Sequence, residues 1–127
     1  MVRVVLPVAA IVVLLAAGCG GKTEYTVGKT RSCLSTRGVQ IGHNLDFVAS
    51  TATGGAFSAS LGDNSVKLVF GETESDAEQI MAAYERFALP NVKAGLPDVL
   101  RRYNNVVTLW HAHPQDADLS LVVGCLR

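Results

Sequence analysis

Two histidines separated by one residue, His111 and His113, are the side chains in this 127-residue sequence whose type and spacing could bind a metal ion. They stand at the end of an apolar run, 106–112, that is typical of a β-strand. Because residues i and i+2 of a strand point to the same side, both imidazoles could contact one ion. Asp116 or Asp118, which follow closely, could supply a third ligand.

A simpler interpretation of this pair is two partly exposed histidines at the end of a strand, and the sequence favours it. No helical His-Glu-x-x-His motif is present, and His43 is distant in the sequence. The sequence also contains no Gly-x-Ser-x-Gly turn and no glycine-rich phosphate loop before a helix. We therefore expect a protein without catalytic residues or a cofactor, with a metal site at His111 and His113 as the alternative.

The apolar run near the N-terminus predicts export from the cytoplasm. Residues 4–18 are about 15 apolar residues, fewer than the roughly 18 to 20 that span a bilayer as a permanent helix. Arg3 supplies a positive charge before the run, and small residues close it. This order is typical of a cleaved signal peptide, which we place over residues 1–18.

The end of this run, Leu15-Ala16-Ala17-Gly18-Cys19, resembles the lipobox of bacterial lipoproteins. In that family the cysteine receives a thioether-linked diacylglycerol and becomes the mature N-terminus, so the resemblance implies an acylated Cys19, with fatty acids such as palmitate. It also implies an anchor on the outer face of the cytoplasmic membrane or elsewhere in the cell envelope. Ala16 stands where these proteins most often have Leu, so a secreted, non-lipidated domain and an uncleaved anchor stay open as alternatives.

The remaining cysteines, Cys33 and Cys125, lie near opposite ends of the expected folded part. An exported domain meets an oxidising compartment, so we predict a disulfide between them, with two separate buried thiols as the alternative. Residues 19–25 are small and polar, as expected of a flexible tether. Residues 26–127 are then a single domain, which is small enough that a covalent bond adds usefully to its stability.

Hydrophobic periodicity predicts an α+β domain. Alternation over 55–71 indicates a β-hairpin whose apolar side chains share one face, and 106–112 reads as a central strand. Helices are predicted over 26–37, ending at Gly38, and from an N-cap at Ser75, with Glu78 completing a capping box, to Pro90. The remaining expectations are an extended piece at 39–41, a helical turn at 98–103 and an undecided stretch at 44–52. At 116–126 a helix is favoured, with a strand as the alternative.

We expect these elements to form two layers, an antiparallel sheet with the hairpin at its centre and helices on one face only. The face that carries Ser58, Ser60 and Lys67 is then wet, as antiparallel sheets allow. The helix that begins at Ser75 covers the other face. Trp110 is expected in the core, and His111 and His113 on the wet side; an exposed Trp110 beside the serines is the alternative.

The charge balance gives no sign of a nucleic-acid partner, because 11 Lys and Arg stand against 11 Asp and Glu. The sequence therefore predicts an extracytoplasmic, membrane-anchored lipoprotein that acts as a binding or interaction module. Its membrane contact is the N-terminal lipid, and its partner is an unidentified envelope protein or small ligand. No residue pattern identifies the binding surface, which we expect on the wet sheet face or the loops.

Overall fold

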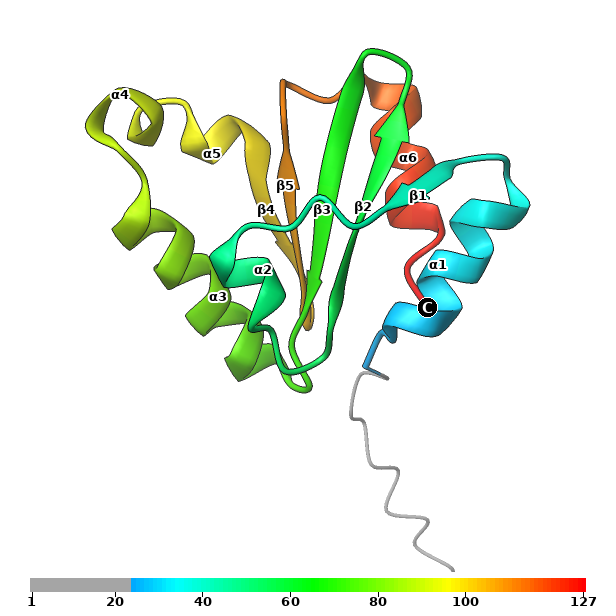
Figure 1. Ribbon diagram of the computed structural model, residues 1–127, viewed down its shortest axis with the longest axis horizontal. Coiled ribbons are helices and arrows are strands. Elements are labelled where there is room, and N and C mark those ends of the chain that lie inside the picture. The colour runs from blue at the N-terminus through cyan, green and yellow to red at the C-terminus, as the bar shows by residue number, and fades with distance from the viewer. Residues whose placement is uncertain (1–23) are drawn as a thin grey trace, which may run out of the picture.

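The computed structural model describes residues 24–127 (Figure 1). The signal peptide expected over 1–18, the lipidation site Cys19 and the tether up to residue 23 lie outside the described residues.

A five-stranded antiparallel sheet organises the described part, in the order β1-β2-β3-β5-β4. The predicted hairpin is confirmed: Leu61 pairs with Asn64 across a two-residue turn, and Gly62 takes the positive φ of 62° that this turn requires. The strand predicted at 106–112 is also confirmed, as an internal strand beside β3. The strands are β1 Gln40–Gly42, β2 Ala56–Leu61, β3 Asn64–Phe70, β4 Leu100–Tyr103 and β5 Val106–Trp110.

The helices agree with most of the sequence predictions. They are α1 Val27–Thr36, α2 Phe47–Ser50, α3 Glu74–Phe87, α4 Pro90–Lys93, α5 Leu96–Val99 and α6 Asp116–Gly124. Gly38, after α1, has a φ of 81°, the left-handed conformation expected past a helix end. The undecided stretch 44–52 contains α2, and the tail is helical as favoured.

Two boundaries need correction. The N-cap of α3 is Thr73, whose hydroxyl accepts from the Asp76 N–H, while the Asp76 carboxylate accepts from the Thr73 N–H. This reciprocal capping box lies two residues before the predicted one at Ser75 and Glu78, because both pairs have the required spacing. The helical turn predicted at 98–103 is only partly right, since α5 ends at Val99 and the next four residues form β4.

Helices cover both faces of the sheet, so the expectation of helices on one face only needs correction, although the α+β class and the antiparallel sheet are confirmed. In Figure 1, α1 and α6 lie on one side of the sheet, and α2 and α3 lie on the other. The predicted apolar face of the hairpin is buried, but under α1 and α6 rather than α3. That first core includes Leu34, Phe57, Leu68, Phe70, Val106, Trp110 and Val122.

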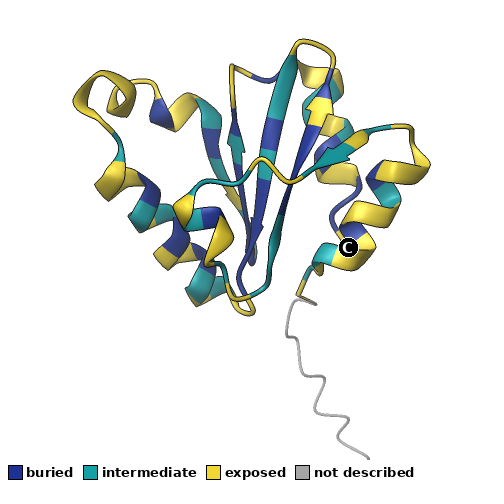
Figure 2. Cartoon of the chain, in the orientation of Figure 1, coloured by how far each residue is buried: buried dark blue, intermediate teal, exposed yellow. Residues whose placement is uncertain are grey.

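The face expected to be wet carries a second core under α2 and α3. It contains Val69 and Val107 from the sheet and Ala77, Ile80 and Tyr84 from α3. The physical reason is the run Val66 to Phe70, in which Val69 points away from Leu68 and is also fully buried. Figure 2 shows the result, with buried residues along the strands and exposed residues on the outer sides of the helices.

Ser58 belongs to this second, covered face and does not face solvent as predicted. It is buried, and its hydroxyl oxygen accepts a hydrogen bond from the Asn44 N–H at 3.1 Å. Ser60 is exposed, as expected. The bond at Ser58 holds the chain between β1 and α2 against the sheet, and this chain forms one wall of the cavity described below.

Asn105 joins three segments that are distant in the sequence. Its buried side chain accepts from the Tyr25 N–H and donates to the Tyr25 and Gly71 carbonyls, each at 2.8 Å. The Gly71 N–H in turn donates to the Asn105 carbonyl at 2.8 Å. Tyr25, the last residue of the expected tether, is therefore part of the folded body.

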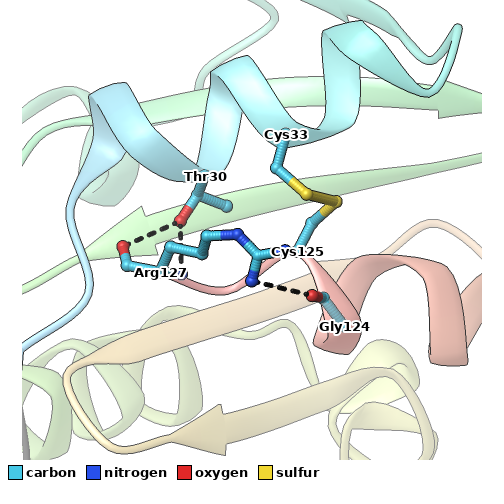
Figure 3. The surroundings of a disulfide bond; sticks show 5 residues. All are labelled: Thr30, Cys33, Gly124, Cys125 and Arg127. Carbon is cyan, nitrogen blue, oxygen red and sulfur yellow. Dashed lines mark hydrogen bonds between the residues drawn. A yellow bond between two sulfur atoms is a disulfide. The ribbon is translucent and has the colours of Figure 1, made fainter.

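The two ends of the described chain are bonded to each other on the α1 and α6 side. The predicted disulfide between Cys33 and Cys125 is present, with Cα atoms 5.4 Å apart (Figure 3). Beside it, the Arg127 N–H donates to the Thr30 hydroxyl at 3.2 Å, and the Thr26 N–H donates to the Arg127 carbonyl at 2.6 Å. These contacts join α1 to the C-terminal residues beside the first core.

Replacing both cysteines, by Cys33→Ala with Cys125→Ala, should lower the free energy of unfolding by as much as about 4 to 5 kcal/mol. The cross-link spans 92 residues, and a loop of this length restricts the unfolded chain by roughly that amount. Urea unfolding of the oxidised protein and of the double variant measures the difference. Reduced wild-type protein serves as the control and should behave like the variant. Two free, alkylatable thiols in denatured, non-reduced protein would contradict the bond.

Candidate functional site

A groove of about 650 Å³ lies beside the sheet on its α3 side, and we call it the lateral groove. Its walls are α2, the end of α3 and the α4–α5 segment, and its floor is formed by β3 and β5. This volume lies within the range of about 300 to 1,000 Å³ that small-molecule sites occupy. Its mostly apolar side chains include Phe47, Phe87, Val92, Leu96, Val99 and Leu109.

The groove exists because the connection from α3 to β4 does not pack tightly on the sheet. This connection, residues 88–99, contains two four-residue helices that each begin beside a proline, Pro90 and Pro97. No residue of α4 is buried, and Leu96 is the buried residue of α5. The segment therefore arches over the sheet and leaves the space beneath it open.

Exposed apolar side chains gather around this opening. Phe47 is 77% exposed, Phe87 65% and Val92 48%, and all three line the groove. Leu89, on the same connection, is also exposed. Isolated apolar residues are common on protein surfaces, but a group of them around one cavity is typical of a binding site.

Three polar side chains, Asp46, Lys67 and Tyr84, form the floor cluster of the groove. The Asp46 carboxylate caps α2 by accepting from the Ala49 N–H at 2.8 Å. It also accepts from the Tyr84 hydroxyl, 3.0 Å from each oxygen, and from the Lys67 ammonium at 3.2 Å. One carboxylate thus links α2, α3 and β3.

This cluster holds its groups in fixed protonation states at neutral pH. Burial by itself raises the pKa of Asp46, but the hydrogen bonds from Ala49, Tyr84 and Lys67 outweigh it and hold the pKa below its usual value. Burial, together with the charge and hydrogen bond of Asp46, raises the pKa of Tyr84 well above its usual range. Asp46 is therefore ionised, and the Tyr84 phenol keeps its proton.

The predicted histidine pair is divided between two places. His111 is exposed and lines one end of the groove, where its backbone N–H donates to the Ser65 carbonyl at 2.9 Å. His113 lies 2.6 Å, through Nδ1, from an Asp98 oxygen on α5. Because β5 ends at Trp110, the strand alternation that would align the two imidazoles does not extend to them.

The carboxylates suggested as third ligands, Asp116 and Asp118, lie in the first turn of α6. Over residues 24–127, no group of three or more His, Cys, Asp or Glu side chains is arranged to hold a metal ion. The metal site at His111 and His113 thus stays a prediction to which the geometry adds no third ligand.

Trp110 is buried in the first core, as expected, with 2% of its surface exposed. A buried indole N–H usually finds a hydrogen-bond partner. Among the described residues Trp110 has none at Nε1, and the Thr108 hydroxyl, two residues before it on β5, likewise lacks one. Trp110 therefore offers no aromatic platform on the surface.

Comparison of the chain with protein-family models, with curated proteins and with solved structures found no match. No helix within the described range is long and apolar enough to cross a membrane.

The sequence interpretation missed the floor cluster, although one signal pointed to it. Lys67 is the only charged residue within the apolar run 66–70, and a charge on a strand buried on both faces needs a partner. The partner, Asp46, lies in the stretch that the sequence left undecided between helix and strand. For the exposed apolar residues around the groove, the sequence offered a weaker indication, namely the apolar residues on either side of Pro90.

Tyr84→Phe should move the acid-unfolding midpoint to higher pH. Loss of the phenol removes a donor that favours the ionised carboxylate, so the pKa of Asp46 rises toward its ordinary value. A carboxyl with a depressed pKa in the folded state adds stability above its unfolded pKa of about 3.9, and this is lost as the pH falls through the folded pKa. Circular dichroism from pH 7 to pH 2 measures the midpoint. Tyr103→Phe on β4 is the matched control, and equal shifts in the two variants would contradict the role of Asp46.

Proposed function

We propose that this chain is a lipid-anchored protein of the bacterial cell envelope that acts as a non-catalytic binding module, with the lateral groove as its ligand site. The observation that carries the proposal is the exposed apolar rim, Phe47, Phe87 and Val92, around a cavity of small-molecule size. Exposing these side chains to water is unfavourable, and an apolar ligand that covers them removes that cost.

The extracytoplasmic location is supported by two independent features. The first is the N-terminal sequence, in which the apolar run 4–18 ends in the lipobox-like residues before Cys19. The second is the bond between Cys33 and Cys125, since disulfides persist in oxidising compartments and are rare in the cytosol.

The position of the chain's entry into the fold is compatible with an anchor. Tyr25 packs against the first core, on the α1 and α6 side of the sheet, whereas the lateral groove lies on the α3 side. Cys19 precedes Tyr25 by six residues, which span at most about 20 Å when extended. A lipid on Cys19 would therefore lie within that distance of Tyr25, so the attachment point of the anchor on the folded body is not in the groove.

The chemistry of the groove supports binding rather than catalysis. Asp46, the carboxylate among its lining residues, accepts from three donors and stays ionised, so it is poorly suited to exchange protons with a substrate. Tyr84 keeps its proton and donates it to Asp46. No specific observation favours the metal-binding alternative, because Nδ1 of His113 is already engaged with Asp98.

Cys19→Ser should abolish incorporation of a clickable fatty-acid probe in cells that express the full chain. The thiol is the atom to which the lipid would attach, so its loss should also release or misprocess the protein. Gel fluorescence of the probe and fractionation of the envelope measure these two effects, with Ser35→Ala, at an exposed position of α1, as the control that should stay labelled. An unlabelled wild-type precursor that remains in the membrane would support an uncleaved anchor instead.

Phe47→Ser should weaken binding of a neutral apolar dye, N-phenyl-1-naphthylamine, by about tenfold. A factor of ten corresponds to about 1.4 kcal/mol, the scale of removing much of one apolar side-chain contact. Residues 24–127, which include both cores and the disulfide, suffice for a fluorescence titration free of membrane background. Val123→Ser, at an exposed apolar residue of α6, is the matched control. Equal effects of the two substitutions would remove the groove as the ligand site.

A further inference from the structure

We propose that the ligand of the lateral groove is a single-chain amphiphile whose head is a hydrogen-bond acceptor, a carboxylate or a phosphate, bound by Lys67 on β3. Its apolar chain lies across β5 toward β4 and α5. This inference rests on the proposed function, namely that the groove is a ligand site.

The first support is a change from polar to apolar along the groove. Over β3, the polar lining residues are Lys67 and Ser65 from the strand, with Asn44 and His111 also in the lining, and Phe47 and Val48 of α2 are the apolar side chains at this end. Lys67 pairs across the sheet with Leu109 of β5, and Leu109 pairs with Leu100, the first residue of β4. Neighbouring strands are about 4.8 Å apart, so the lining becomes apolar within one strand spacing of the Lys67 backbone.

Beyond Leu109 the groove stays apolar. Val99 and Leu96 of α5 and Phe87 at the end of α3 line this part, and Val92 lies at its rim. No charged side chain is among these lining residues. A ligand that is polar at one end and apolar along the rest matches both ends of the groove, whereas a wholly apolar ligand would displace water from the other Lys67 donors without replacing its hydrogen bonds.

The second support is the balance of donors and acceptors at the polar end. The oxygens of Asp46 accept from three donors, Ala49, Tyr84 and Lys67, which occupy three of the about four acceptor positions of a carboxylate. An ammonium group has three donors, and the hydrogen bond from Lys67 to Asp46 uses one of them. The ligand therefore meets donors, from Lys67 and the Ser65 hydroxyl, and a head that accepts hydrogen bonds is favoured.

The third support is that the strands of the floor have no sheet edge, and so no row of unpaired backbone N–H and C=O groups, to offer a ligand. The floor strands β3 and β5 are both internal, since β3 pairs with β2 and β5, and β5 pairs with β3 and β4. A peptide that adds a strand needs unpaired backbone groups at a sheet edge, and this floor offers side chains only. The groove volume, about 650 Å³, also suits a small molecule better than a protein surface.

Photolabelling of the full, acylated chain in phosphatidylcholine nanodiscs tests the proposal. The probe is hexadecanoic acid with a diazirine in its chain. Its methyl ester, whose head carries no charge, is the control probe. Mass spectrometry of the labelled peptides locates the attachment. We expect labelling of residues 87–99 and Leu109, at least about tenfold stronger for the acid than for the ester, a ratio that matches the loss of one charge-assisted hydrogen bond.

Variants of the head site sharpen the test. Lys67→Met should reduce labelling by the acid to the level of the ester, Lys67→Arg should retain it, and Lys29→Met on the exposed side of α1 should change nothing. Unlabelled hexadecanoic acid and hexadecyl phosphate, added as competitors, distinguish a carboxylate head from a phosphate head. If Lys67→Met does not fold, as circular dichroism would show, Ser65→Ala with His111→Ala takes its place and should also weaken labelling by the acid.

The outcomes separate this proposal from the one on which it rests. Equal labelling of the groove by acid and ester, unchanged in Lys67→Met, would overturn the assigned head while the groove remains a ligand site. Absence of label from residues 87–99 and Leu109 with both probes, together with dye binding that Phe47→Ser leaves unchanged, would overturn the groove itself. Loss of acid labelling in Lys67→Met alongside retention in Lys67→Arg supports the proposal.

Discussion

The central hairpin strand, β3, buries side chains on both of its faces, and the rest of the architecture follows from this constraint. Leu68 and Phe70 need cover on one side and Val69 on the other. A single helical layer cannot bury both sets, because successive residues of a strand point in opposite directions. The domain therefore has α1 and α6 on one face and α2 and α3 on the other.

The two helical layers differ in how many contacts hold them in place. On the α1 and α6 side, the Cys33–Cys125 bond and the contacts of Arg127 join the two ends of the described chain to each other, and the Asn105 hydrogen bonds join Tyr25 to the turn between β4 and β5. On the α3 side, the connection over residues 88–99 is held by few buried side chains. The lateral groove is the consequence, so the covalent and hydrogen-bonded cross-links lie on one face of the sheet and the open cavity on the other.

Lys67 has a double role in this arrangement. It lies on a strand that is otherwise apolar, and the cost of placing its charge there is offset by Asp46, which also caps α2 and accepts from Tyr84. The same ion pair puts an ammonium group at the polar end of the groove. A residue that is unfavourable for packing alone is thereby consistent with the proposed recognition of an acceptor-bearing head.

The sequence by itself determined the features that depend on local chemistry. The hairpin, with Gly62 in its turn, and the helix end at Gly38 follow from short-range patterns that tertiary contacts did not alter. For the tail, the sequence favoured a helix but left a strand open. The α+β class was predictable from the same patterns. The pairing of Cys33 with Cys125 was predictable only through the expectation of export, which left two cysteines for one bond.

Only the tertiary structure decided which helix covers which face and where the groove lies. Hydrophobic periodicity shows that a helix has an apolar side, but it does not say which side of a sheet receives it, and α3 covers the face that the pattern left polar. The meeting of Asp46, Lys67 and Tyr84 joins residues 21 and 38 positions apart. No local spacing encodes that contact, because it arises from the packing of α2 and α3 on one sheet.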